Sequence, residues 1–172
     1  MVRALFPGTF DPIHYGHIDI AERAARLFDE VLMAVYDRPL KTLIFSPEER
    51  MELVKEAFKD SPKINVTGYS GLTVDFARKV GAQVIVRGLR VFSDFEFEFR
   101  MALANHRLAS DVEIVAFITN EEHTFLSSTT VREIAMLGGD VSSMVPPHVE
   151  KALKEKVDGL DGDSSPPNAL RD

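Results

Sequence analysis

The sequence predicts an α/β fold: an open, five-stranded parallel sheet with helices on both of its faces. Short apolar runs alternate along the chain with segments whose apolar residues recur at helical spacing. The turns between them contain Gly, Pro and Asp, which commonly end regular structure. The 172 residues are enough for one domain with a sizeable core, and we expect that domain to span residues 1–157.

The first predicted strand leads into the most distinctive turn of the chain. The apolar run 2–6 ends at Pro7, and a polar segment bracketed by glycines follows over 8–17. A helix is predicted over 18–28, where apolar residues recur at helical spacing. Open α/β sheets bind phosphorylated ligands at such strand-to-helix turns, because backbone N–H groups and the positive helix end converge there.

The remaining elements follow from the same patterns. Ser46-Pro-Glu-Glu49 spells a capping box with Pro at the first helical position. Gly81 and Gly138 are placed to end two further helices, and Arg87 stops a buried strand. The predicted strands are 31–36, 64–69, 84–86 and 112–118, and the predicted helices are 47–59, 73–80, 129–137 and 147–157. A further helix is expected over 94–108, although residues 94–100 alternate charged and aromatic side chains in the manner of a strand.

Composition excludes several classes of function. The net charge of −7 argues against broad nucleic-acid binding, and no apolar run approaches the length of a membrane span. The chain has no cysteine, which excludes disulfides and thiol chemistry and fits a cytoplasmic protein. No export signal is visible at the start of the chain. Residues 158–172 carry too few apolar side chains to order themselves, so we expect a disordered tail.

Polar residues suited to phosphate binding follow each predicted strand. The carboxyl ends of parallel strands share one edge of a sheet, so residues scattered over the sequence should meet in one cleft. The residues concerned are Thr9 and His17, Lys41, the segment 71–73, Arg87 and Arg90, and the segment 127–129.

Four segments together resemble one enzyme family. Residues 7–20 read PGTFDPIHYGHIDI, residues 87–90 read RGLR, residues 94–100 read DFEFEFR, and residues 125–132 read FLSSTTVR. In this order they resemble the nucleotidylyltransferase superfamily, and within it the bacterial phosphopantetheine adenylyltransferases. The resemblance covers about residues 1–157 and implies a Rossmann-like fold. It departs from the family at His123, where relatives often carry Trp, and at Phe6, where they often carry Tyr.

The resemblance implies transfer of AMP from ATP to 4′-phosphopantetheine, giving dephospho-coenzyme A and pyrophosphate. It also implies a homohexamer, Mg²⁺ delivered with ATP and no dedicated metal site, with coenzyme A as a candidate regulator. The catalytic residues that it implies are Thr9, His17, Lys41 and Arg90. The implied substrate contacts are Thr9, Lys41, Thr73 and Arg87. The implied ATP contacts are Thr9, Phe10, His17, Gly88, Leu89, Arg90, Glu98, His123, Thr124, Phe125, Leu126, Ser127, Ser128 and Thr129.

The chemistry of that reaction agrees with the residue types present. The nucleophile is already a phosphate oxyanion, so no general base is required, and no nucleophile triad is visible in the sequence. The reaction needs two polyanions aligned in line and the growing charge neutralised. Arg87 and Lys41 would hold the acceptor phosphate, and Thr9 and His17 would hold the α-phosphate. Arg90 and the hydroxyls of 127–129 would receive the pyrophosphate.

Simpler interpretations exist for several of these residues. The two arginines of 87–90 could be solvated, and the hydroxyls of 127–129 could form an ordinary N-cap. His14 and His17 have metal-pair spacing, but no third ligand is suggested, so zinc is disfavoured and His14 is interpreted as a surface residue. Four phenylalanines are too many for one helix face, which favours a helix lying partly in the core and partly in a subunit contact. They are Phe92, Phe95, Phe97 and Phe99.

Two other functions remain open on the sequence. One is another nucleotidylyltransferase, for example one that acts on nicotinamide mononucleotide. Lys41, RGLR and DFEFE favour pantetheine over that alternative. The other is a non-catalytic nucleotide sensor, which could lose its charge-stabilising residues, whereas all of them are present here.

Overall fold

The structure is a computed structural model that describes residues 1–37 and 42–161. Within these residues the chain forms one parallel sheet of five strands, in the order β3-β2-β1-β4-β5. The predicted parallel α/β fold is therefore confirmed. The strands are β1 (Arg3–Gly8), β2 (Glu30–Tyr36), β3 (Ile64–Tyr69), β4 (Val84–Leu89) and β5 (Glu113–Ile118).

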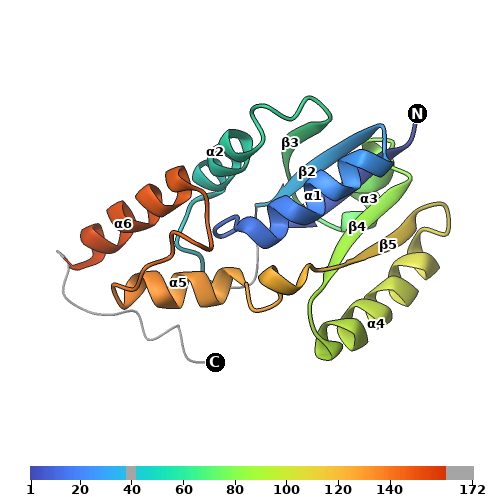
Figure 1. Ribbon diagram of the computed structural model, residues 1–172. Helices are drawn as coiled ribbons and strands as arrows, with labels where there is room; N and C mark the ends of the chain where they lie inside the picture. Colours follow the sequence, from blue (N-terminus) through green and yellow to red (C-terminus); the bar gives the residue numbers. More distant parts are fainter. Residues whose placement is uncertain (38–41, 162–172) are drawn as a thin grey trace.

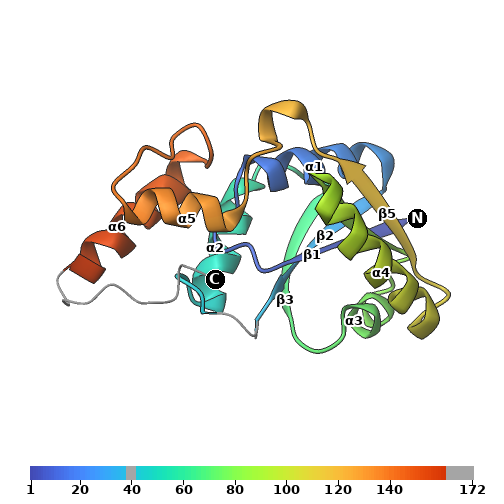
Figure 2. The same ribbon diagram turned by 90° about the horizontal axis from the view of Figure 1, so that it is seen from below.

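The helices cover both faces of this sheet. In Figure 2, α1 lies above the strands and α3 below them, and α4 slants down beside β5. Helices α2, α5 and α6 gather at one end of the molecule (Figure 1). The helices are α1 (Tyr15–Leu27), α2 (Pro47–Ala57), α3 (Thr73–Lys79), α4 (Phe92–Leu108), α5 (Ser128–Met136) and α6 (Pro147–Asp161), with a short 3-10 turn over Glu121–His123.

Alternation along the strands divides the core between the two faces. In β1, Phe6 points to the face covered by α1, and its neighbour Leu5 points to the face covered by α3. The first face packs against α1 and also against α2, α5 and α6, through residues such as Ile20 and Val54. The second face packs against α3 through residues such as Val74. Burial on both faces explains why the strands read as continuous apolar runs.

The predicted helix boundaries are largely those observed. The Ser46 hydroxyl accepts a hydrogen bond from the Glu49 amide at 3.2 Å, and the Glu49 carboxylate accepts one from the Ser46 amide at 2.8 Å, which confirms the capping box. Gly81 and Gly138 follow the ends of α3 and α5 with φ of +68° and +76°, a backbone conformation that favours glycine.

The register of the sheet opens a gap between β1 and β4. Their pairing is limited to Ala4 with Val84 and Leu5 with Ile85. By contrast, β1 stays paired with β2 up to Gly8, and β4 stays paired with β5 up to Leu89. The chain also changes direction across the sheet here, since β2 and β3 lie on one side of β1 and β4 and β5 on the other. The carboxyl ends of β1 and β4 therefore separate at the topological switch point, where open α/β sheets bind ligands.

Several expectations from the sequence are corrected. The fourth strand does not stop at Arg87 but includes it and continues to Leu89, because β5 pairs with it along this length. The last helix extends to Asp161, four residues into the predicted tail, and residues 162–172 lie outside the described residues.

Helix α4 also differs from its prediction. None of its residues is buried, so it is not a core helix in the single chain. Phe92 is 86% exposed, and Phe95, Phe97 and Phe99 are each about half exposed. The core part of the interpretation is therefore wrong, and the subunit contact stays a prediction.

Candidate active site

The first cavity lies where β1 and β4 separate, and its volume is about 350 Å³. The ends of β1 and β4 and the starts of α1, α4 and α5 contribute to its wall. The lining side chains that carry charge or hydrogen-bonding groups are His14, His17, Arg87, Arg90, Asp94, Glu98, Thr119, His123, Ser127, Ser128 and Thr129. Three segments of sequence far apart along the chain thus supply one polar pocket.

The backbone after β1 shapes the floor of this cavity. Phe10 has φ of +52°, a left-handed conformation that is uncommon for a bulky side chain. Its ring lies over Gly8, where an added Cβ would come 2.8 Å from the ring. The same ring meets His17 edge-on, with centroids 5.0 Å apart. A glycine at position 8 therefore leaves room for the Phe10 ring to pack edge-on against the imidazole of His17.

His17 lies in the first turn of α1, as predicted. The His14 amide donates a hydrogen bond to its Nδ1 at 3.3 Å. Because Nδ1 is the acceptor in this bond, the proton of a neutral His17 ring resides on Nε2. The ring lines the first cavity.

His14 is not a surface residue, so its sequence interpretation is wrong. Its side chain is 5% exposed and its ring is stacked on that of His17. Burial, with smaller contributions from the positive charge of Arg90 and from His123, lowers the pKa of His14 to about 3. His14 is therefore neutral at physiological pH. Burial and the nearby positive charge of Arg90 both disfavour its protonated form.

Arg90 connects the start of α4 to the start of α5. Its guanidinium donates to both carboxylate oxygens of Asp94, at 3.1 and 3.3 Å, and to the carbonyl of Leu126 at 2.7 Å. Partial burial alone would raise the pKa of Asp94, but the hydrogen bonds from Arg90 outweigh it and lower that pKa. The arginine is thus fixed beside the N-terminus of α5.

The start of α5 presents its hydroxyls and backbone to the same cavity. Ser127 is the N-cap, and its hydroxyl accepts from the Thr130 amide at 3.0 Å. The Ser128 hydroxyl donates to the carbonyl of Pro12 at 2.9 Å, and the Thr129 hydroxyl accepts from Arg132 at 3.3 Å. Ser127 therefore acts as an ordinary N-cap of α5. The helix N-terminus still faces the cavity, where its backbone N–H groups and dipole favour an anion.

A second cavity, of about 430 Å³, adjoins the first across β1 and β4. Pro7, Gly8, Arg87 and Glu98 line both cavities. Arg87 donates to the two carboxylate oxygens of Glu98, at 2.6 and 2.8 Å. The remaining wall of the second cavity is mostly apolar, and includes Tyr36, Tyr69, Leu72, Val74, Phe97, Met101 and Ile114. A pocket for an anion therefore borders a pocket suited to a longer, less polar group.

Comparison with known proteins decides the family. The family described as cytidylyltransferase-like matches residues 5–134. A phosphopantetheine adenylyltransferase of Roseiflexus sp. (strain RS-1) is 56% identical over 154 residues, which cover 90% of this chain and 96% of that protein. One from Ralstonia pickettii (strain 12J) is 51% identical over 162 residues, covering 94% and 97%. The chain belongs to the phosphopantetheine adenylyltransferase family.

A solved structure supports the fold independently. The crystal structure of a putative nicotinate-nucleotide adenylyltransferase from Vibrio parahaemolyticus superposes with a TM-score of 0.65 at 20% identity. The match covers 90% of this chain and 99% of that one. At this identity the likeness shows the shared fold of the two proteins.

The structure brings most of the site residues implied by the family resemblance to the two cavities. Arg87 and Glu98 line both, and Thr9 and Thr73 line the second. Leu89, Thr124 and Phe125 line neither, and Lys41 lies outside the described residues. The implied residues that line the first cavity alone are Phe10, His17, Gly88, Arg90, His123, Leu126, Ser127, Ser128 and Thr129.

Sequence reasoning missed a buried polar cluster behind the family's signature turn. The Asp11 carboxylate accepts from the amides of Ile44 and Phe45, at 3.0 and 2.9 Å. Arg132 donates to the Asp11 carbonyl, and Arg50 donates to the carbonyl of Thr9. Arg50 could have been noticed in the sequence, because it precedes Val54 and Phe58 at four-residue spacing on an apolar helix face.

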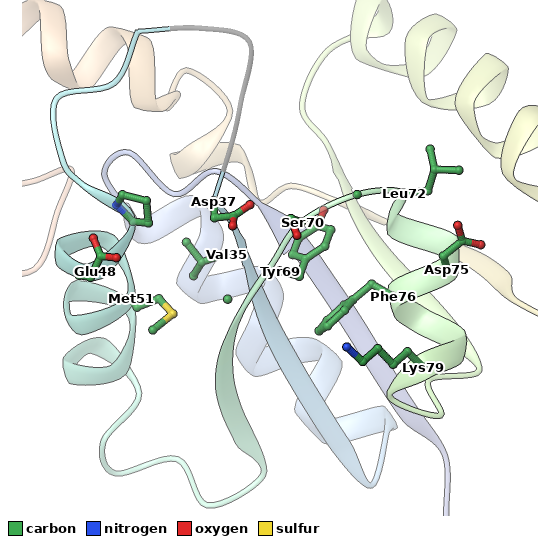
Figure 3. A pocket seen from close by; sticks show the side chains of 13 residues that line it. Val35, Asp37, Glu48, Met51, Tyr69, Ser70, Leu72, Asp75, Phe76 and Lys79 are labelled. Atoms are coloured by element: carbon green, nitrogen blue, oxygen red, sulfur yellow. The ribbon is translucent and has the colours of Figure 1, made fainter.

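A third cavity, with a volume of about 580 Å³ the largest of the three, lies between α2 and α3 at the edge strand β3. Figure 3 shows Met51 and Glu48 on one side and Phe76, Asp75 and Lys79 on the other. It shares Tyr69, Gly71 and Leu72 with the second cavity, and of the implied catalytic residues that the structure describes, Thr9, His17 and Arg90, none lines it. Among the described residues it therefore borders the second cavity and shares no lining residue with the first.

In residues 1–37 and 42–161, no group of three or more His, Cys, Asp or Glu side chains is arranged to hold a metal ion. No helix in the described part of the chain is both long and apolar enough to cross a membrane.

Proposed function

We propose that this chain transfers AMP from ATP to 4′-phosphopantetheine, giving dephospho-coenzyme A and pyrophosphate, in the biosynthesis of coenzyme A. The observation that carries the proposal is the pair of adjoining cavities at the separated ends of β1 and β4. One is lined by cationic, imidazole and hydroxyl groups around a helix N-terminus, and the other is mostly apolar. They meet at Arg87, where an acceptor phosphate would have to lie to attack a nucleotide in the first cavity.

Membership of the phosphopantetheine adenylyltransferase family supports the same assignment. The relatives carry the acceptor in their name, and this chain matches them over nearly their whole length. The second cavity agrees with that acceptor, since a pantetheine arm needs a long, mostly apolar pocket with a phosphate site at one end. Thr73 and Tyr69, whose hydroxyl oxygens lie 3.0 Å apart, contribute to its wall.

In this mechanism the acceptor phosphate attacks the α-phosphorus directly, with no covalent intermediate. The phosphate is already an oxyanion, so no general base is needed. Thr9 and the Nε2–H of His17 stabilise the charge that grows on the α-phosphoryl oxygens. Arg90 and the α5 N-terminus hold the β- and γ-phosphates and receive the pyrophosphate. Arg87 and Lys41 hold and align the acceptor.

Mg²⁺ enters this proposal as part of the nucleotide. The carboxylates that line the first cavity, Asp94 and Glu98, are occupied by Arg90 and Arg87. They do not form a separate cage, which suits an ion held by phosphate oxygens and water. When bound, Mg²⁺ would neutralise charge on the triphosphate.

We propose a homohexamer in the cytoplasm, with dephospho-coenzyme A as product and coenzyme A as a regulatory ligand. The half-exposed phenylalanines of α4 support an assembly, because exposed apolar patches of this kind commonly mark protein interfaces.

The test is an assay of pyrophosphate release from ATP with each candidate acceptor. Turnover with 4′-phosphopantetheine and none with nicotinamide mononucleotide is the expected result. Turnover with nicotinamide mononucleotide instead would assign the chain to another nucleotidylyltransferase activity. Binding of ATP, measured by calorimetry, without turnover of either acceptor would support the sensor alternative.

A further inference from the structure

Arg50 is a charged side chain with no solvent exposure, the largest side chain that the described part of the protein buries completely. It projects from α2, which lies outside the wall of the first cavity. Its Nη1 donates to the carbonyls of Thr9 and Tyr36, each at 2.7 Å, and its Nε donates to the carbonyl of Phe45 at 3.3 Å. Burying a guanidinium is costly unless such partners are present, and these contacts satisfy Nη1 and Nε, whereas Nη2 is buried without a hydrogen-bond partner.

The two carbonyls that accept from Nη1 belong to residues that line the same cavity. Thr9 and Tyr36 both line the 430 Å³ cavity, and neither lines the 350 Å³ cavity. Thr9 follows β1 and Tyr36 ends β2, so Arg50 joins the carboxyl ends of two neighbouring strands from behind. The hydrogen bonds from the Arg50 side chain all go to backbone carbonyls. Arg50 itself lines none of the three cavities.

The same cluster also fixes the chain just before α2. Phe45, whose carbonyl accepts from Arg50, donates its amide to the Asp11 carboxylate at 2.9 Å. Asp11 in turn lies two residues after Thr9. Arg50 and Asp11 therefore tie three segments together: the turn after β1, the end of β2 and the start of α2.

We propose that Arg50 is a positioning residue for the acceptor half of the site. By holding the carbonyls of Thr9 and Tyr36, it sets the wall of the second cavity and the alignment of the bound acceptor with the nucleotide. This inference rests on the proposed function, since it assigns the second cavity to 4′-phosphopantetheine. Small errors of alignment in a transfer between two bound reactants lower the rate by large factors.

The geometry requires arginine in particular. Nη1 reaches two carbonyls from one nitrogen while Nε reaches a third, which uses the planar spread of the guanidinium. A lysine ammonium ends about one bond nearer the backbone and has no second arm. Arg50→Lys therefore keeps the buried positive charge near Asp11 but loses the simultaneous hold on the two strand ends.

Steady-state kinetics of Arg50→Lys test this role. The expected result is a fall in kcat and a rise in KM for 4′-phosphopantetheine, each about 10- to 100-fold, with KM for ATP within about 2-fold of the native value. The matched control is Arg132→Lys, a second buried arginine, which bonds the Asp11 carbonyl and the Thr129 hydroxyl beside the first cavity. It should raise KM for ATP more than KM for the acceptor.

Thermal unfolding of both variants separates positioning from loss of structure. If Arg50→Lys loses its cooperative unfolding transition, Arg50→Gln, which buries no charge, replaces it in the same comparison. Equal changes in both KM values, or a lowered Tm with native kinetics, would overturn the positioning role alone. A native chain that does not turn over 4′-phosphopantetheine would overturn the proposed function and this role together.

Discussion

The imidazole rings of His14 and His17 lie stacked, with their centroids 3.7 Å apart and their planes 25° apart. Gly16 allows this arrangement, because a Cβ there would come 3.0 Å from Cε1 and Nδ1 of His14. Phe10 meets the ring of His17 edge-on. His17 is therefore held by ring contacts from two residues before any substrate binds, as a preorganised hydrogen-bond donor should be.

Replacing His17 by Ala should lower kcat about 10²–10³-fold, the loss typical of one preorganised donor to a transition state. The fold should persist, because the ring lies at the wall of a cavity and is only partly buried. Pyrophosphate release at saturating substrates and circular dichroism measure the two effects. A variant with native turnover would remove His17 from the mechanism.

His14 should make the stability of the protein depend on pH. Its folded-state pKa of about 3 lies below the 6.5 of the unfolded chain, so between these values the unfolded state binds the extra proton. Its contribution to stability is therefore complete above pH 6.5 and decreases as the pH falls toward 3. Between pH 7.5 and pH 5.0 this residue alone should lower the free energy of unfolding by roughly 2 kcal/mol.

The variant His14→Gln should lose that part of the pH dependence. Urea unfolding of the native chain and of His14→Gln at pH 7.5 and 5.0 is the measurement, and the difference between the two proteins isolates His14 from other titrating groups. If both proteins lose the same stability over this interval, the ring of His14 is protonated in the folded state and is not held neutral by burial.

The two substrates should be separable by mutation. Lys41→Ala should weaken 4′-phosphopantetheine far more than ATP, since loss of one charge-assisted bond costs roughly 1.5–3 kcal/mol, or about 10–150-fold in binding. Ser128→Ala should do the reverse more mildly, because its hydroxyl lines only the first cavity and also bonds Pro12. Calorimetric titration of each ligand into each variant checks both expectations.

The control for that pair is Ser143→Ala, an exposed serine outside the described cavities. It should leave both affinities at their native values. Equal losses for the two ligands in Lys41→Ala would contradict the role of that lysine.

Substitution of α4 phenylalanines by Asp should reduce the size of the assembly. Phe95 and Phe99 are stacked with centroids 5.8 Å apart, and both are about half exposed on the single chain. A carboxylate placed in an apolar contact would be desolvated without a partner, which disfavours association. Light scattering measures the mass, and Leu137→Asp, at an 82% exposed position after α5, is the control. Unchanged mass in both phenylalanine variants would place the interface elsewhere.

Local patterns in the sequence were sufficient for the parallel sheet, the capping box of Ser46 and Glu49, and the helix ends at Gly81 and Gly138. Each depends on residues close together in the chain, so periodicity and turn chemistry report them directly. The clustering of polar residues at one sheet edge also followed, because parallel strands bring their carboxyl ends together whatever lies between them. Thr9, His17, Arg87 and Arg90 meet there for that reason.

The tertiary structure alone decided what depends on distant partners. His14 is a polar residue in a polar turn, and its burial arises from packing against His17 beside His123 and Arg90. Arg50 finds its partners at Thr9 and Tyr36, 41 and 14 residues away in sequence. The pairing of Arg87 with Glu98 likewise joins β4 to α4. The sequence gives the identity of each side chain. Only the tertiary structure determines which charged groups are desolvated and which hydrogen-bond partners replace water around them.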